Sequence, residues 1–455
     1  MHRLTRNCTG RAFPSQARIA IFFLTLIFYG FKEPWWLIPF VICIGFDFLW
    51  ASQIHCAESI QSRKLWLILS VSQNIFLLAF FKYRSFILEN MALLGVHLPV
   101  PVIQIEGKEL GLPAGISFYT FESLSFVIDV YRREITPPKS VSEFFGFIGM
   151  FPRFVAGPIV RYRNMVSQFK SFRGMQVESG LFLFIYGLFL KVVFADNFSV
   201  FTQYAFGRTS WDFLGAWIGA LAYTFHMYFD CSGYSLMAIG LGKALGFQFP
   251  TNFNRPYLAV GAQDFWRRWH MSLSTWLRDY LYISLGGSRR GRVRTYVNLF
   301  LTMLIGGLWH GAQWHFVLWG TFHGVWLALE RMLGIEKWMP RSVHWITTFI
   351  VIVTGWVIFR SENGLGEIRG IMAAMFCPTN FSFNTEGLRV HPLALVLSGV
   401  GIWHCFWFER RLNASALEDL MEISLGKVWA ALGMLLTALI LGFSERTIPF
   451  IYFQF

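Results

Sequence analysis

Residues 35–54 read WWLIPFVICIGFDFLWASQI and contain one charged side chain, Asp47. A helix rises about 1.5 Å per residue, so about 20 apolar residues cross a bilayer hydrocarbon core about 30 Å thick. This stretch therefore has the length and the composition of a transmembrane helix. It predicts an all-α polytopic membrane protein.

Apolar stretches of the same kind recur along the chain, which predicts about eleven spans in all. Composition agrees, because 55% of the residues are hydrophobic and only 14% are charged, against about 25% charged in soluble domains. The same figures exclude a disordered chain. The further predicted spans are residues 18–31, 65–81, 112–130, 181–194, 211–229, 296–309, 316–329, 343–359, 393–408 and 428–443.

Two weaker apolar stretches, 86–94 and 144–160, are short or broken by Pro and Gly. Such segments are typically re-entrant or interfacial, because irregular backbone survives at membrane depth only where protein or a water-filled cavity satisfies it. We therefore expect a helical bundle with an internal cavity. The sequence shows no fixed repeat and no Pro/Ser-rich linker, so residues 1–455 are predicted to form a single domain, with the first span kept as an anchor.

The formal net charge is +13, which in a soluble protein would suggest nucleic acid as a partner. In a membrane protein, Lys and Arg collect in cytoplasmic loops, so no nucleic-acid partner is expected. Two basic clusters are predicted to be cytoplasmic: Arg161, Arg163, Lys170 and Arg173, and Arg289, Arg290, Arg292 and Arg294. Arg289 and Arg290 either serve topology alone or form a docking surface for a phosphate-bearing donor.

Residues 264–283 read DFWRRWHMSLSTWLRDYLYI and are predicted to form an amphipathic helix. Its aromatic and apolar face would hold Trp266, Trp269, Leu273, Trp276 and Tyr280, and another face Arg267, His270, Ser274 and Arg278. Asp264 is expected to cap the helix and to pair with Arg268 four residues on. A helix lying at the membrane surface would explain the arginines, but not the histidine among them.

The run GGLWHGAQWH at 306–315 places His310 at the end of, or inside, an apolar span. Gly306, Gly307 and Gly311 are expected to let other backbones approach closely. An ionisable residue in such a place suggests function, and histidine suits acid/base catalysis. A buried packing histidine is the alternative, and His315 and His323 compete for the catalytic role. Their spacing does not favour a metal site. Elsewhere, Lys191 is expected to pair with Asp196 near a helix end or to extend its amine to the membrane interface.

Six motifs in order resemble the membrane-bound O-acyltransferase family, in its bacterial branch of alginate, peptidoglycan and cellulose O-acetylation proteins. They are LPAGISFYTFESLSFVIDVYR (112–132), FPRFVAGPIVRY (151–162), FDCSGYSLMAIGL (229–241), NFNRPY (252–257), the 264–283 segment and GLWHGA (307–312). The resemblance covers residues 20–335. It implies a ring of about eleven tilted helices, with re-entrant or interfacial helices, around a funnel and a tunnel. The motif core is residues 112–335, and residues 336–455 would add C-terminal spans.

The resemblance also implies the chemistry. His310 matches the essential family histidine and His270 the second one. Substrate contacts are expected from Arg267, Ser274, Arg278, Asn254 and Trp309. The implied reaction carries an acetyl or other short acyl group from a cytoplasmic thioester, acetyl-CoA or a similar co-substrate, with no bound cofactor or metal. Implied partners are membrane lipid and a polysaccharide or a periplasmic acetyltransferase of the SGNH type, at the bacterial inner membrane.

Two other classes of function fit the residues alone. A transporter or flippase for a lipid-linked or acylated intermediate could use His270 and His310 as a proton relay. A structural scaffold for a secretion complex would need neither histidine. An acyltransferase differs from both because it releases the free thiol of the donor in step with a new ester.

Overall fold

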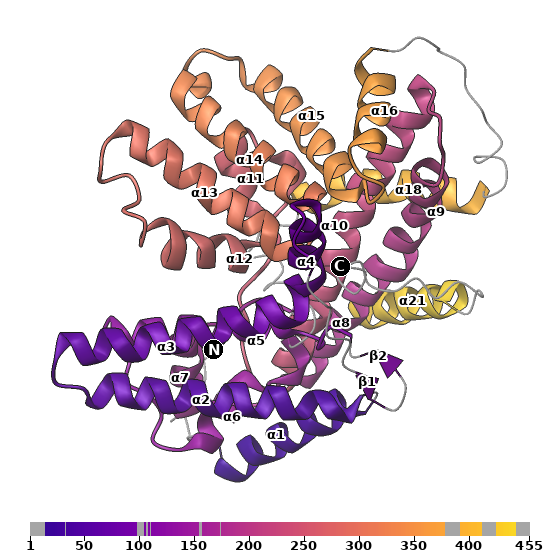
Figure 1. The fold of residues 1–455 in the computed structure, drawn as a ribbon. Coiled ribbons are helices and arrows are strands. Elements are labelled where there is room, and N and C mark those ends of the chain that lie inside the picture. The colour runs from indigo at the N-terminus through magenta and orange to yellow at the C-terminus, as the bar shows by residue number, and fades with distance from the viewer. Residues whose placement is uncertain are drawn as a thin grey trace. The chain divides into compact units, whose positions relative to one another are not determined.

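The structure is a computed structural model that describes residues 14–31, 33–97, 104–105, 108–109, 111–153, 157–172, 174–377, 392–411 and 425–442 (Figure 1). Almost all of its regular elements are helices. In the described part, the strands are β1 (Gln104–Ile105) and β2 (Lys108–Glu109), which pair antiparallel. Two compact units divide the chain: Met1–Gly180 with Ala238–Pro250, and Leu181–Met237 with Thr251–Phe455.

The first unit is built around an aromatic core. Phe40, Phe126, Phe144 and Phe147 are fully buried in it, and Arg153 forms a buried ion pair with Glu122. Its helices are α1 (Ser15–Gly30), α2 (Leu37–Cys56), α3 (Ile60–Leu78), α4 (Arg84–Leu93), α5 (Ile116–Tyr131), α6 (Val141–Ile148) and α7 (Tyr162–Lys170), with the short turns η1 (Pro34–Trp36), η2 (Ala79–Tyr83) and η3 (Phe151–Arg153).

The second unit holds the histidine motifs. It begins within α8 (Val177–Phe189) and takes most of α10 (Phe213–Ala244). Its other helices are α9 (Asp196–Phe206), α11 (Ala262–Arg268), α12 (Met271–Trp276), α13 (Arg292–His310), α14 (Trp314–Leu333), α15 (Arg341–Arg360), α16 (Leu365–Phe376), α18 (Pro392–Trp403), α19 (Glu409–Arg411) and α21 (Leu425–Gly442). Five further helical segments are η4 (Leu190–Ala195), η5 (Pro256–Leu258), η6 (Leu277–Tyr282), η7 (Ile335–Lys337) and η8 (His404–Phe408).

Helices α13 and α14 form a closely packed antiparallel pair (Figure 1). A Cβ on Gly307 would lie 2.3 Å from the carbonyl oxygen of Phe316 and 2.9 Å from Cα of Gly320. The predicted close backbone approach is therefore confirmed at Gly307. At Gly306 and Gly311 the nearest neighbours are side chains, those of Leu277 and Phe316, so the prediction was wrong for these two positions.

Four helical stretches in the described residues are long and apolar enough to cross a membrane. They are Pro34–Cys56, Ile60–Leu93, Val177–Phe206 and Arg341–Arg360, and they contain the predicted spans 35–54, 65–81, 181–194 and 343–359. Shorter apolar helices occupy Ile19–Gly30, Pro392–Phe408 and Val428–Leu441. The total of eleven spans and the single domain stay predictions. Some residues named in the sequence predictions lie outside the described residues: 1–13, 154–156, Arg173 and 443.

The predicted pairing of Lys191 with Asp196 is confirmed, with Nζ 2.5 Å from Oδ1. A second carboxylate, that of Asp230 in α10, lies 2.8 Å from the same Nζ. Lys191 is 5% exposed, so the two aspartates provide charge partners for an ammonium group that is almost removed from solvent.

Candidate active site

A cavity of about 920 Å³ opens in the second unit between α11, α12, η6, α13 and α14. Helix α13 contributes Leu299, Thr302, Met303, Gly306 and His310 to its lining. These positions recur at three- and four-residue steps, so they share one face of the helix. At about 1.5 Å per residue, that face runs for about 16 Å from Leu299 to His310.

The lining changes from charged and exposed to aromatic and buried. The exposed charged residues, which we call the charged rim, are Arg267, Arg278, Arg331, Glu336 and Lys337. His310 and Trp319, which we call the aromatic end, are 7% and 1% exposed, and their ring centroids lie 5.0 Å apart. The cavity can therefore hold a molecule with an anionic part at the rim and a reacting group beside His310.

His310 is the last residue of α13, as its sequence position predicts. Its ring packs edge-on against Trp309, Trp319 and Phe359, with centroid distances of 5.0, 5.0 and 5.2 Å. This aromatic surrounding leaves the His310 side chain only 7% exposed, while the imidazole still forms part of the cavity wall. An imidazole in that setting can take a proton from a hydroxyl group that enters the cavity.

The two competing histidines lie elsewhere. His315 and His323 are 3% and 2% exposed, and neither belongs to the described lining of the cavity. His323 packs against Trp266 and Trp319 at 5.2 and 4.8 Å between ring centroids. Burial among rings fits a packing role for His323. Of His310, His315 and His323, only His310 belongs to the described lining of the cavity.

The predicted continuous helix over 264–283 is wrong. Helix α11 ends at Arg268, α12 begins at Met271, and the segment continues as the π-helix η6. His270 lies at the break with φ 43° and ψ 54°, the left-handed conformation. For a residue other than glycine this costs on the order of 1–2 kcal/mol, so surrounding contacts must hold it.

Asn252 and Asn254 supply such contacts from a neighbouring segment. The Asn254 N–H donates to the Arg268 carbonyl at 2.9 Å, and the Met271 N–H donates to the Asn252 carbonyl at 2.8 Å. The Asn252 Oδ1 also accepts from the Ser272 N–H and hydroxyl, at 3.1 and 2.9 Å. Asn252 belongs to the NFNRPY motif, but these hydrogen bonds were not predicted from the sequence. Asn254 supports the break through its backbone and lies outside the described lining.

His270 is 3% exposed, and its ring lies 6.2 Å from that of Trp309. Burial lowers the pKa of His270 to about 4, so its ring is neutral at pH 7. Trp309 thus packs against both predicted histidines. Neither His270 nor Trp309 belongs to the described lining of the cavity, so their direct contact with a substrate stays a prediction.

Three of the predicted substrate contacts do share the cavity. Arg267, Ser274 and Arg278 all line it. The Ser274 hydroxyl donates to the Trp269 carbonyl at 3.0 Å, and Arg278 Nε pairs with Asp279 at 2.6 Å. Arg289 and Arg290 are exposed in the turn before α13 and do not line the described cavity. Their role as a docking surface is untested.

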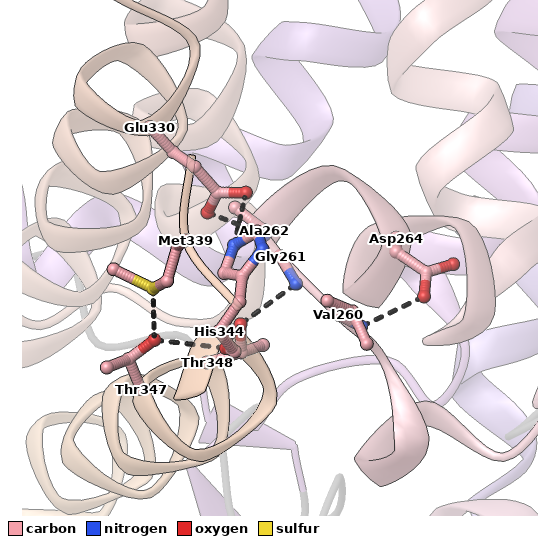
Figure 2. A network of polar contacts seen from close by, with 9 residues as sticks. All are labelled: Val260, Gly261, Ala262, Asp264, Glu330, Met339, His344, Thr347 and Thr348. Carbon is pink, nitrogen blue, oxygen red and sulfur yellow. Dashed lines mark hydrogen bonds and ion pairs between the residues drawn. The ribbon is translucent and has the colours of Figure 1, made fainter. Parts of the chain in front are cut away.

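A polar network fixes the start of α11 (Figure 2). Glu330, which also lines the cavity, accepts the Ala262 N–H at 2.8 Å and lies 3.2 Å from Nε2 of His344. Gly261 has φ 96°, and a Cβ there would lie 2.3 Å from Glu330 Oε1. Glycine is therefore required at this position. No local pattern in the sequence pointed to Glu330 or His344, because Glu330 contacts Ala262 across 68 positions of the chain and His344 contacts Glu330 from a different helix, α15.

Asp264 does not take the predicted capping position. Helix α11 begins two residues earlier, after Gly261. Asp264 accepts the Val260 N–H at 3.0 Å from within the first turn. Its expected pair with Arg268 is confirmed at 2.8 Å. Glu330 therefore satisfies an N-terminal amide of α11 that a helix leaves without an internal partner.

Comparison with known proteins agrees with this geometry. A model of the MBOAT, membrane-bound O-acyltransferase family, matches residues 55–358, a range that contains every residue of the cavity. The chain belongs to the membrane-bound O-acyltransferase family. This membrane enzyme is therefore an O-acyltransferase, which disfavours the transporter and scaffold alternatives. Helices α16, α18, α19 and α21 follow the matched range.

Relatives of the acyltransferase carry names that refer to different polymers. A probable alginate O-acetylase AlgI of Pseudomonas putida is 38% identical, over 94% of this chain and 92% of the relative. A peptidoglycan O-acetyltransferase of Helicobacter pylori is 39% identical, over 74% of this chain and 70% of the relative. A teichoic acid D-alanyltransferase of Bacillus subtilis is 27% identical, over 53% of this chain and 65% of the relative.

Proposed function

We propose that the enzyme transfers an acetyl group from a cytoplasmic thioester, acetyl-CoA, for O-acetylation of a cell-envelope polysaccharide or exopolysaccharide. The acceptor is the polymer itself or the serine of a periplasmic SGNH-type partner. One observation carries the proposal: His310 lies in the buried part of a cavity whose exposed lining is charged. Relatives named for alginate and peptidoglycan support a polymer as the final acceptor.

The charged rim supplies the donor contacts in this proposal. The exposed lining carries four positively charged side chains: Arg267, Arg278, Arg331 and Lys337. The lining contains two carboxylates, Glu330 and Glu336, so positive charge is in excess. Arginine side chains bind phosphate oxygens through charge-assisted hydrogen bonds. The basic turn with Arg289 and Arg290 precedes α13, which supports a cytoplasmic position for the start of that helix in the proposed bacterial inner membrane.

His310 is the proposed general base. It takes the proton of the acceptor hydroxyl as the hydroxyl oxygen bonds to the thioester carbonyl carbon. The carbon–sulfur bond then breaks, and the proton returns to the departing thiolate, so an ester and a free thiol form. Exclusion of water by the aromatic end protects the thioester from hydrolysis. His270 is the proposed second residue of the site, where it orients the donor or polarises its carbonyl. Trp309 supports both histidines, because His270 and His310 both pack against it.

The proposed architecture completes this scheme. About eleven tilted helices in one domain would form a ring, with a funnel from the donor side and a tunnel from the acceptor side meeting near His310. No bound cofactor is proposed, since the donor is a co-substrate. In the described residues, no three His, Cys, Asp or Glu side chains gather as metal ligands.

Substitution of His310 tests the proposal. His310→Ala, in membranes with wild-type protein levels, is expected to lower acetyl transfer from labelled acetyl-CoA by about 10²- to 10⁴-fold, the usual contribution of general acid/base catalysis. Matched release of free CoA should fall with it. His315→Ala, outside the described lining, is the control and should retain most activity. Unchanged transfer by His310→Ala would reject the assignment.

A further inference from the structure

The cavity has a wall beside His310 to which the proposed reaction assigns no part in the choice of acyl group. Trp319 lines the cavity and meets the His310 ring at an angle of 85° and a centroid distance of 5.0 Å. Its side chain is 1% exposed, so most of the indole is packed into protein. A group bound next to His310 therefore meets the face of the cavity that Trp319 forms.

A second layer of rings backs Trp319. Phe359 and His323 lie 5.4 and 4.8 Å from it, and Trp356 stacks on it at 6.1 Å, all as centroid distances. These three residues are at most 3% exposed, and none belongs to the described lining of the cavity. Protein interiors are packed as closely as organic crystals. Trp319 consequently has filled space behind it.

The orientation of the donor follows from the proposed function, on which this inference rests. A thioester with its phosphates at the charged rim reaches His310 with the acyl group leading. Once the carbonyl lies beside His310, each added methylene of the acyl chain extends toward Trp319. Forcing extra methylenes into a filled core is unfavourable.

We propose that Trp319 sets the acyl-chain length that the enzyme accepts. The wall admits acetyl and excludes butyryl and longer chains. The selectivity depends on the Trp319 ring, because Trp356, Phe359 and His323 lie behind Trp319. Shortening Trp319 should enlarge the cavity by part of the indole volume and no further.

The first test uses the wild-type enzyme in membranes with acetyl-, propionyl-, butyryl- and hexanoyl-CoA. The ratio kcat/KM is expected to fall at least tenfold from acetyl to butyryl and further to hexanoyl. Equal use of acetyl and hexanoyl donors would overturn the proposal without any variant.

The second test compares variants of two tryptophans on α14. Trp319→Ala is expected to raise the butyryl-to-acetyl ratio of kcat/KM at least tenfold, and Trp319→Phe to raise the propionyl-to-acetyl ratio by a smaller factor. Trp326→Ala is the matched control, because Trp326 is on the same helix but outside the described lining. It should keep the wild-type ratios.

These ratios separate selectivity from general damage to the site. Unchanged ratios in Trp319→Phe and Trp319→Ala, with acetyl transfer retained, would overturn the role of Trp319. If Trp319→Ala fails to accumulate, Trp319→Phe and the wild-type series carry the test. Failure of the proposed function looks different: the wild-type enzyme would release no CoA with any donor, or His310→Ala would remain fully active.

Discussion

The charged rim and the aromatic end of the cavity are held in place by different interactions. Rim residues such as Arg267 and Lys337 are exposed, where salt screens their charges. His310 and Trp319 are fixed by contacts with rings on α11, α13, α14 and α15, all of them buried except the half-buried Trp266 of α11. We therefore expect the rim to govern donor affinity, and the aromatic end to govern rate and selectivity.

The largest expected loss of stability comes from the α13–α14 pair, which carries His310, Trp319 and the rim residue Arg331. Gly307→Ala would place a methyl group 2.3 Å from the Phe316 carbonyl oxygen, so α13 and α14 must separate. Overpacking of this kind typically lowers the free energy of unfolding by about 1–3 kcal/mol. Thermal unfolding in detergent should show the loss, and transfer activity should fall with it.

The neighbouring glycine provides the control. A Cβ on Gly306 meets only the flexible end of the Leu277 side chain, at 3.1 Å. Gly306→Ala should therefore change the unfolding temperature far less than Gly307→Ala. Equal effects at the two positions would show that the close backbone approach does not set the spacing of the helices.

Removal of two charges from the rim tests whether the rim governs donor affinity. Arg267→Ala with Arg278→Ala is expected to weaken donor binding by about 1–2 kcal/mol, because each arginine contributes a charge-assisted contact. That loss corresponds to a roughly 5- to 30-fold higher KM. The value of kcat should change little, and KM should depend less on salt than in the wild-type enzyme.

Two arginines in the basic turn before α13 provide the control for the Arg267 and Arg278 variant. Arg289→Ala with Arg290→Ala removes the same charge from exposed residues outside the described lining. We expect a rise in KM below about threefold, since these two side chains do not line the described cavity and would act on the donor only through a field that salt screens. A larger rise than that of the rim pair would move the main docking surface to the turn.

The smallest expected effect concerns Glu330, which joins the cavity lining to the start of α11. Glu330→Gln removes the charge that faces the Ala262 N–H and His344. Hydrogen bonds to charged groups are stronger than neutral ones, so stability should fall by about 1 kcal/mol. Thermal unfolding is the measurement.

Glu336→Gln is the control for Glu330, because Glu336 is an exposed carboxylate of the same cavity. Its substitution should leave the unfolding temperature unchanged. A fall as large as that of Glu330→Gln would mean that the network in Figure 2 adds no stability of its own.

Local patterns predicted the elements well and their breaks poorly. The apolar spans and the position of His310 at the end of α13 follow from hydropathy over one helix length. The break at His270 does not, because the helical periodicity of residues 264–283 continues through it. Hydrogen bonds from Asn252 and Asn254 override that periodicity, and they come from another part of the chain.

The sequence by itself determined the membrane-protein class, the family and the histidine that ends α13. These properties depend on composition and on spacings within one helix or motif. Only the tertiary structure decided that His310 rather than His315 or His323 lines the cavity, and that Trp319 closes it behind an exposed charged rim. Such choices depend on packing between α11, α13, α14 and α15, whose contacts join residues too far apart in the chain for any local pattern to record.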